Sequence, residues 1–191
     1  IDDQLARILD YLEETGQRDN TVIILTTDHG EMMGDHGLLQ KGCRFYEGLV
    51  RVPLIFSWPG HFQVNLHSDA LVELLDMTPT VLELTGLEVP DYVQGKTLLP
   101  ILRGDAPPDY HRDFVRCEYF DAIFSPATRE AAGLLGSEMA PGREAPTQES
   151  LDTAVGTFAT MYRDRRYKLI VYHGHNLGEL YDLQEDPWEF D

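Results

Sequence analysis

Apolar residues near the amino-terminal end recur at the spacing of one face of a helix. The positions are Leu5, Ile8, Leu9 and Leu12, each three or four residues from a neighbour on the same face. This period predicts an amphipathic helix, with Asp2 placed to cap it and Gly16 placed to end it.

The next pattern is a continuous apolar run, TVIILTT, at residues 21–27. A short β-branched run without alternation is typical of a strand that is covered on both faces in a parallel sheet. A similar run predicts a second buried strand at 52–57, which a Pro-Gly turn closes. A helix, a short loop and a buried strand in this order indicate an α/β fold.

A second helix is expected at residues 79–84. Thr78 can cap it, Pro79 suits its first turn, and Gly86 can end it. Along the sequence, the α/β part therefore begins with a helix, continues with two strands and has a second helix after them.

Proline, glycine and charged residues accumulate at 104–109, which predicts a boundary. We therefore divide the chain into an α/β part, 1–105, and a small antiparallel β subdomain, 106–191. The second part holds three strand-like segments, DFVRCEYF, TFATMYRDRRYKLIVYH and GELYDLQEDP, and the polar turn inside the middle one predicts a hairpin. Between the first two segments, residues 125–150 lack a sustained apolar period and are expected to form a mobile excursion.

The charge balance excludes broad classes of partner. The 191 residues carry 33 acids against 15 lysines and arginines, a formal net charge of -18. This excess opposes attraction to nucleic acid or to an anionic membrane, so an anionic ligand would need a local cationic site. No apolar run is long enough to span a bilayer, and no signal-peptide pattern occurs in these residues, so the compartment stays open.

The stretch TTDHGEMMGDHGLLQKG concentrates ionisable groups directly after the first predicted strand. In open α/β sheets, ligand sites form beyond the carboxyl ends of strands, where Asp28 and His29 are placed. A carboxylate and an imidazole on consecutive residues can turn towards one cation. The residues alone leave an alternative open, in which Asp28 caps the following turn and His29 binds a backbone carbonyl.

The same stretch holds a cation among glycines. The ammonium of Lys41 could neutralise a tetrahedral oxyanion bound on a metal, although composition also permits a surface lysine. His36 could either reach a substrate or satisfy its own loop. Glu31 and Asp35 are expected to be loop acids that face solvent.

The stretch DNTVIILTTDHGEMMGDHGLLQKGCRFYEGLVRVPLIFSWPG resembles the carboxyl-terminal half of the arylsulfatase family, within the alkaline-phosphatase-like superfamily. The segments IDDQLARILDYLEETGQRDNT, LLDMTPTVLELTGLEVPDYVQGKTLLPIL and MYRDRRYKLIVYHGHNLGELYDLQEDPWEFD are similar to motifs of the same family in the same order. The resemblance implies an α/β fold: the carboxyl-terminal portion of an alkaline-phosphatase-like sheet with flanking helices, followed by a small antiparallel sheet.

The resemblance also implies a function, the hydrolysis of a sulfate ester or sulfamate. By position, Asp28 and His29 correspond to a late pair of metal ligands, and Lys41 to a lysine that contacts the sulfate oxygens; His36 is a further catalytic candidate. Calcium is the metal that the resemblance implies, with manganese or magnesium as alternatives because imidazole is less typical of calcium. The expected substrate is a small aryl sulfate, sulfated sugar or sulfamate.

Two parts of the family's active site are not found in these residues. The family's nucleophile is a formylglycine made from the first residue of a Cys/Ser-x-Pro-x-Arg motif, which does not occur here, and the early metal-binding aspartates are also missing. Cys43 is not that nucleophile and is interpreted as a packed thiol or loop residue. We therefore expect the formylglycine upstream of Ile1, an inactive fragment, and a homodimer formed through an exposed sheet edge.

Two other functions compete with the sulfatase hypothesis. A phosphonate monoester or phosphodiester hydrolase of the same superfamily would use similar residues, because sulfur and phosphorus oxyanions differ mainly in charge. A non-catalytic binding or assembly module is the alternative outside enzymes.

Overall fold

The structure is a computed structural model that describes residues 1–120, 158–174 and 176–190. The chain forms two compact units. Unit 1 comprises Ile1–Gly30 and Arg51–Val115, and unit 2 comprises Glu31–Val50 and Arg116–Asp191. The predicted division at residue 105 differs from these units mainly because it assigned 31–50 to the amino-terminal part.

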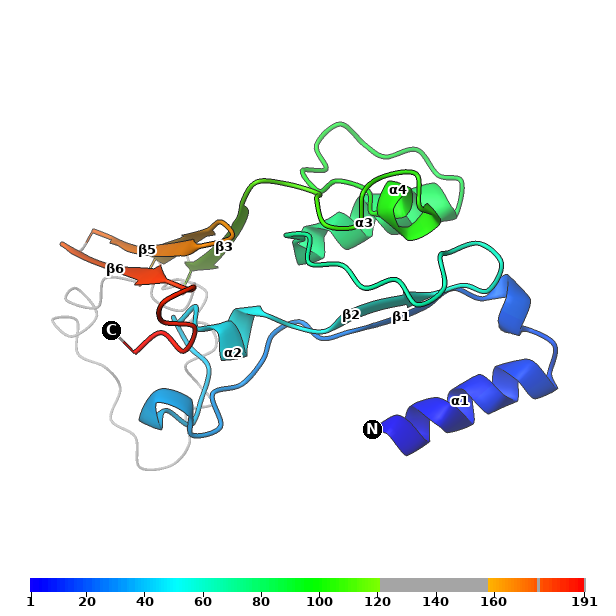
Figure 1. Ribbon diagram of the computed structural model, residues 1–191, viewed down its shortest axis with the longest axis horizontal. Coiled ribbons are helices and arrows are strands. Elements are labelled where there is room, and N and C mark those ends of the chain that lie inside the picture. Colours follow the sequence, from blue (N-terminus) through cyan, green and yellow to red (C-terminus); the bar gives the residue numbers. More distant parts are fainter. Residues whose placement is uncertain (121–157, 175, 191) are drawn as a thin grey trace, which may run out of the picture. The chain divides into compact units, whose positions relative to one another are not determined.

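Both units contain helices and strands (Figure 1). In chain order the elements are α1 (Asp2–Glu14), η1 (Arg18–Asn20), β1 (Ile23–Thr26), η2 (Asp35–Gly37), α2 (Glu47–Val50), β2 (Leu54–Ser57), η3 (Leu74–Asp76), α3 (Met77–Leu84), α4 (Leu99–Arg103), β3 (Val115–Phe120), β4 (Phe158–Arg163), β5 (Tyr167–His173) and β6 (Leu177–Asp182). The predicted excursion at 125–150 lies outside the described residues.

The two strands of unit 1 form an antiparallel pair, with Ile23 opposite Ser57 and Thr26 opposite Leu54. Every residue of β1 is half-buried, and Ile55 of β2 is 54% exposed. The prediction of a strand buried on both faces in a parallel sheet is therefore wrong for the described part of this chain. An apolar run predicts a strand, but it does not specify which strand pairs with it.

Helix α1 confirms the helical period at the amino-terminal end, but its cap differs from the prediction. Ile1, not Asp2, occupies the cap position, and Asp2 lies in the first turn, where the helix dipole favours an acid. The helix ends at Glu14, and Gly16 follows in the left-handed conformation at φ +67°. No residue of α1 is fully buried.

Helix α3 confirms the second predicted helix, and it begins two residues earlier than expected. Thr78 lies inside the helix, so the prediction that it caps α3 is wrong; Asp76 holds the cap position. Pro79 lies in the first turn, and Gly86 follows the helix at φ +72°, both as predicted.

Asp76 joins separate segments of unit 1. Its carboxylate is fully buried and accepts hydrogen bonds from the backbone N–H groups of Glu73 (2.9 Å) and Lys96 (2.8 Å). The guanidinium of Arg112 forms ion pairs with Asp76 and with Glu73, and His111 Nε2 lies 3.4 Å from Asp76 Oδ2. One buried carboxylate therefore connects η3, the segment before α4 and the segment before β3.

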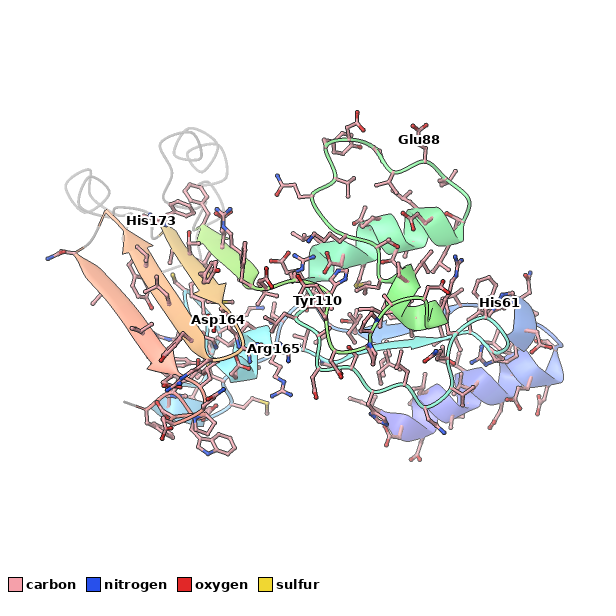
Figure 2. All side chains as sticks on the ribbon, turned by 45° about the horizontal axis from the view of Figure 1, so that its top comes forward. His61, Glu88, Tyr110, Asp164, Arg165 and His173 are labelled. Carbon is pink, nitrogen blue, oxygen red and sulfur yellow. The ribbon has the colours of Figure 1, made fainter. Side chains whose placement is uncertain are left out.

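Unit 2 contains a four-stranded sheet in the order β3-β4-β5-β6. Strands β4 and β5 form an antiparallel hairpin, and β6 pairs antiparallel with β5, which confirms the predicted small antiparallel sheet. The hairpin turn is closed by the carboxylate of Asp164, which accepts from the N–H groups of Tyr167 (2.6 Å) and Arg166 (2.7 Å). These bonds lower the pKa of Asp164. Figure 2 labels Asp164 and Arg165 at this turn and His173 at the other end of β5.

The inward face of this sheet forms the core of unit 2. The buried cluster consists of Phe45, Ala159, Met161, Ile170 and Tyr181. Cys43 and Cys117 keep their thiols and pack against this cluster, which confirms that Cys43 is a packed thiol. No helix in the described ranges is both long and apolar enough to cross a membrane.

We predict that Asp76→Ala destabilises the protein strongly. The substitution leaves the Arg112 guanidinium and two backbone N–H groups without their buried acceptor. Breaking such a pair costs about 3–5 kcal/mol of unfolding free energy. Urea denaturation followed by circular dichroism measures this loss. The exposed Asp91→Ala is the control and should change the unfolding free energy by less than about 0.5 kcal/mol; equal losses in the two variants would contradict the assignment.

Candidate metal and anion site

Asp28 lies in the turn that follows β1, with its side chain 83% exposed. Its Oδ1 accepts hydrogen bonds from the Thr27 hydroxyl (3.2 Å) and from the His29 backbone N–H (3.1 Å). These bonds, the Thr27 bond first, lower the pKa of Asp28 below its ordinary value. The turn therefore favours the carboxylate form and leaves it on the surface.

His29 is oriented by its own turn. The Nδ1 atom lies 2.7 Å from the carbonyl oxygen of Gly30. Since a carbonyl oxygen can only accept, this contact places a proton on Nδ1, and in the neutral ring Nε2 then carries the lone pair. Metal-ligating histidines are commonly held in this way, by a hydrogen bond from the second ring nitrogen.

The two side chains are spaced as ligands of one cation would be. His29 Nε2 lies 3.4 Å from Asp28 Oδ2. Two ligands at right angles, bound at about 2.1–2.4 Å, lie roughly 3.0–3.4 Å apart. The pair therefore fits a divalent cation. Within the described ranges no group of three or more His, Cys, Asp and Glu residues could hold a metal, so further ligands would have to come from elsewhere.

The sequence left open an alternative in which Asp28 caps the turn and His29 binds a backbone carbonyl, and this geometry is compatible with it. Asp28 accepts from the turn through Oδ1, and His29 contacts a carbonyl through Nδ1. A metal would instead bind Asp28 Oδ2 and His29 Nε2. Stabilising the turn and binding a metal therefore use different atoms of these residues, and the contacts within the turn orient both side chains.

His36 belongs to unit 2 and is held by the packing of that unit. Its ring stacks on Tyr46 with centroids 3.9 Å apart and lies 4.7 Å from the ring of Phe190. Its Nε2 lies 2.9 Å from the carbonyl of Trp188 and 3.2 Å from that of Glu189, and the side chain is only 11% exposed. These contacts join the loop to the carboxyl-terminal segment, and a catalytic role for His36 stays a prediction.

Lys41 also belongs to unit 2, in the loop between η2 and α2. The residue is exposed, and Gly42 follows it at φ +117°, a conformation that favours glycine. Met32 and Phe45, which lie before and after this loop segment, are each 2% exposed. The loop is therefore anchored at both ends and presents Lys41 on the surface. Glu31 and Asp35 are exposed, as predicted.

The sequence interpretation missed a buried ion-pair network in unit 2. The side chain of Lys168 is fully buried, and its Nζ lies 2.6 Å from carboxylate oxygens of both Glu47 and Glu189. Alternation along β5 was a usable signal, because it places Lys168 on the same face as the buried Ile170. A lysine on the core face needs anionic partners.

Comparisons with known proteins extend over the whole chain. A family profile described as Sulfatase matches residues 1–87. The multifunctional alkaline phosphatase superfamily protein PehA of Trinickia caryophylli is 41% identical over 195 residues, which cover 100% of this chain and 33% of PehA. An N-acetylglucosamine-6-O-sulfatase of Bacteroides thetaiotaomicron is 32% identical over 193 residues, 99% of this chain and 29% of the relative. The chain belongs to the sulfatase family.

A solved structure supports the same fold for this sulfatase-family chain. The crystal structure of a phosphonate monoester hydrolase of Agrobacterium radiobacter matches 100% of the chain and 34% of its own, with a TM-score of 0.71 and 34% identity. The predicted alkaline-phosphatase-like fold is confirmed. The chain spans about a third of the length of the relatives that it matches.

We predict that this sulfatase-family chain binds divalent metal weakly and through Asp28. With two protein ligands, the dissociation constant should lie on the order of 1 mM, at the weak end for calcium sites. Isothermal calorimetry with calcium, manganese and magnesium measures it. Asp28→Ala should abolish the binding, whereas Glu31→Ala, which removes an exposed carboxylate of the same loop, should leave it unchanged. Tight binding that survives Asp28→Ala would contradict the assignment.

Proposed function

We propose that the protein hydrolyses sulfate esters with a divalent cation that Asp28 and His29 help to hold. The observation that carries the proposal is the 3.4 Å separation of Asp28 Oδ2 and His29 Nε2 at the end of β1, in a sulfatase-family chain. Calcium is the first choice of metal, and manganese or magnesium also accepts these ligands. The proposed substrates are small sulfated molecules: an aryl sulfate, a sulfated sugar or a sulfamate.

Each residue of the site would have a distinct task. Asp28 presents an ionised oxygen, because the bonds from Thr27 and His29 favour its carboxylate. His29 presents Nε2 because Gly30 holds its other nitrogen. Lys41 supplies ammonium donors to the sulfate oxygens and offsets charge that develops during transfer. A bound cation would polarise the S–O bonds.

We also propose that catalysis requires parts of a longer protein. The chain covers 29–33% of the relatives PehA and N-acetylglucosamine-6-O-sulfatase, and it contains no Cys/Ser-x-Pro-x-Arg motif. A formylglycine nucleophile and further metal ligands would come from those other parts. On this proposal the 191 residues alone do not catalyse the reaction.

A phosphonate monoester or phosphodiester hydrolase is the second candidate. It is supported by the phosphonate monoester hydrolase of Agrobacterium radiobacter, which matches the chain at 34% identity over its whole length. The proposed roles suit either oxyanion, because a cation held by Asp28 and His29 and the ammonium of Lys41 would both attract its negatively charged tetrahedral oxygens. A non-catalytic binding module is a weaker candidate, since such a module has no need for both metal-binding and anion-binding residues.

Parallel rate measurements test the choice between the two esters. We expect the full-length enzyme to hydrolyse an aryl sulfate with a higher kcat/KM than the matching aryl phosphonate monoester. Both substrates should carry the same phenol, so that the leaving group is constant. A clear preference for the phosphonate would replace the sulfatase proposal by the second candidate.

We predict that Lys41→Ala in the full-length enzyme lowers kcat by roughly 100- to 1000-fold. This is the range for the loss of one donor that stabilises transition-state charge. Steady-state kinetics with an aryl sulfate measures it. Lys96→Ala removes another exposed lysine, which lies in unit 1, and should leave the rate unchanged. Equal kinetics for Lys41→Ala and wild type would show that Lys41 is a surface lysine without a catalytic role.

A further inference from the structure

We propose that Lys168 and Glu189 are positioning residues for Lys41: their buried network holds both sides of the loop on which Lys41 lies. The inference rests on the proposed function, in which Lys41 contacts the sulfate group. It adds residues of the carboxyl-terminal sheet and of the segment after β6 to the machinery of that site.

Lys168 fastens the part of the loop that follows Lys41. Its Nζ donates to the carbonyl oxygen of Phe45 at 2.8 Å and lies 2.6 Å from Glu47 Oε1. The third contact is Glu189 Oε1, also at 2.6 Å. The ammonium group therefore has two hydrogen-bond acceptors, Phe45 and Glu189, and forms an ion pair with Glu47. Phe45 and Glu47 belong to the segment just after Lys41.

Glu189 completes this attachment from the carboxyl-terminal segment. While its Oε1 accepts from Lys168, its Oε2 accepts from the backbone N–H of Glu47 at 2.7 Å. The residue is 3% exposed and has a φ of +60°, in the left-handed region. A non-glycine residue adopts that region at a cost, and it does so where surrounding contacts determine its position.

The part of the loop that precedes Lys41 is fastened to the same segment. The ring of His36 lies against Tyr46 and Phe190, and its Nε2 faces the carbonyls of Trp188 and Glu189. Glu189 is thus contacted from both sides of the loop, at its carbonyl by His36 and at its carboxylate by Lys168 and Glu47. Lys41 lies between these two attachments in the sequence.

Charge balance makes this network sensitive to the loss of any member. Arg163 Nε lies 3.3 Å from Glu47 Oε1, so two cations, Arg163 and Lys168, match two carboxylates, Glu47 and Glu189. Buried ion pairs are often no more stabilising than apolar residues of similar size. The neighbouring core position on β5, Ile170, is apolar. The charged group at 168 is therefore better explained by the geometry that it imposes on the loop.

The loop itself needs an imposed geometry. Gly34, Gly37 and Gly42 all have positive φ values, and glycines leave the backbone many alternatives when the chain is not held. A misplacement of about 1 Å in a group that contacts the reacting centre can lower a rate by about 100-fold. Loosening the Lys168 network should therefore reduce catalysis through Lys41.

A double-mutant cycle in the full-length enzyme tests this coupling. The variants are Lys168→Met, Lys41→Ala and the combination, with kcat and KM measured on an aryl sulfate. We expect Lys168→Met to lower kcat by about 10- to 100-fold in the wild-type background but by less than about 3-fold in the Lys41→Ala background, because Lys168 acts through Lys41. Lys168→Arg, which keeps the positive charge, should restore part of the rate.

The outcomes separate the two proposals. Equal losses from Lys168→Met in both backgrounds would show a general structural role and overturn the positioning proposal alone. If Lys41→Ala itself leaves the hydrolysis of aryl sulfate and aryl phosphonate unchanged, the role of Lys41 in the proposed function fails, and the positioning proposal fails with it.

A milder variant covers the case in which Lys168→Met does not fold. Glu189→Gln keeps the size of the side chain and removes the charge that faces Lys168. It should show the same coupling to Lys41→Ala and raise the hydrogen-exchange rates of amides 38–44 by at least about 10-fold. Glu185→Gln, an exposed carboxylate of the same segment, is the matched control and should change neither quantity. Unchanged exchange and additive kinetics in Glu189→Gln would overturn the proposal.

Discussion

Among the residues that the structure describes, each unit contains a fully buried charged side chain that is paired with opposite charges. In unit 1 the fully buried carboxylate of Asp76 accepts from two backbone N–H groups and pairs with Arg112. In unit 2 the fully buried ammonium of Lys168 pairs with Glu47 and Glu189. Because an unpaired buried charge is costly, the segments that carry the partners must come to it. The ion pairs of Asp76 and Lys168 thus hold irregular segments of both units in place.

The ionisable groups of the candidate site have the opposite environment. Asp28 is 83% exposed, and Lys41 is exposed at the surface of its loop. Asp28 and Lys41 are exposed to solvent, whereas the charges of Asp76 and Lys168 are buried and hold segments of the fold together. Burial therefore separates the two roles among residues that look alike in a sequence with 33 acids and 15 lysines and arginines. His36 has features of both groups, because its ring is packed against other side chains, as the buried residues are, while its loop carries the exposed Lys41.

Local patterns predicted the parts of this structure that local physics determines. The polar turn before Tyr167 closes as a hairpin because the side chain of Asp164 caps its own backbone. Asp28 and His29 follow the end of β1, as the sequence order predicts, and their side chains lie 3.4 Å apart, whereas their binding of a metal stays a prediction. The partner of β1 was not predictable, because an apolar run does not encode whether the neighbouring strand is parallel or antiparallel.

Long-range pairing explains the other differences. Thr78 has the right chemistry for a cap, but it lies inside α3, because η3 continues directly into that helix. The carboxylate of Asp76 is held by the backbone N–H of Lys96 and by Arg112, both distant in the sequence. Glu47 and Glu189 meet at Lys168 from opposite ends of the chain, and nothing near either residue indicates the meeting. Period-2 alternation in β5 shows that Lys168 faces the core, but only the folded chain identifies its partners.

The exposed charge of Lys41 and the buried charge of Lys168 are connected through one loop. Residues 31–50 carry the exposed Lys41, and the same residues supply Phe45 and Glu47 to the buried Lys168. The glycines of this loop leave its backbone many conformations unless other contacts hold it. The buried ammonium of Lys168 is held by two hydrogen bonds, to Phe45 and Glu189, and by an ion pair with Glu47. The placement of Lys41 therefore depends on the buried contacts of Lys168, and this is the role that we assign to the buried charge.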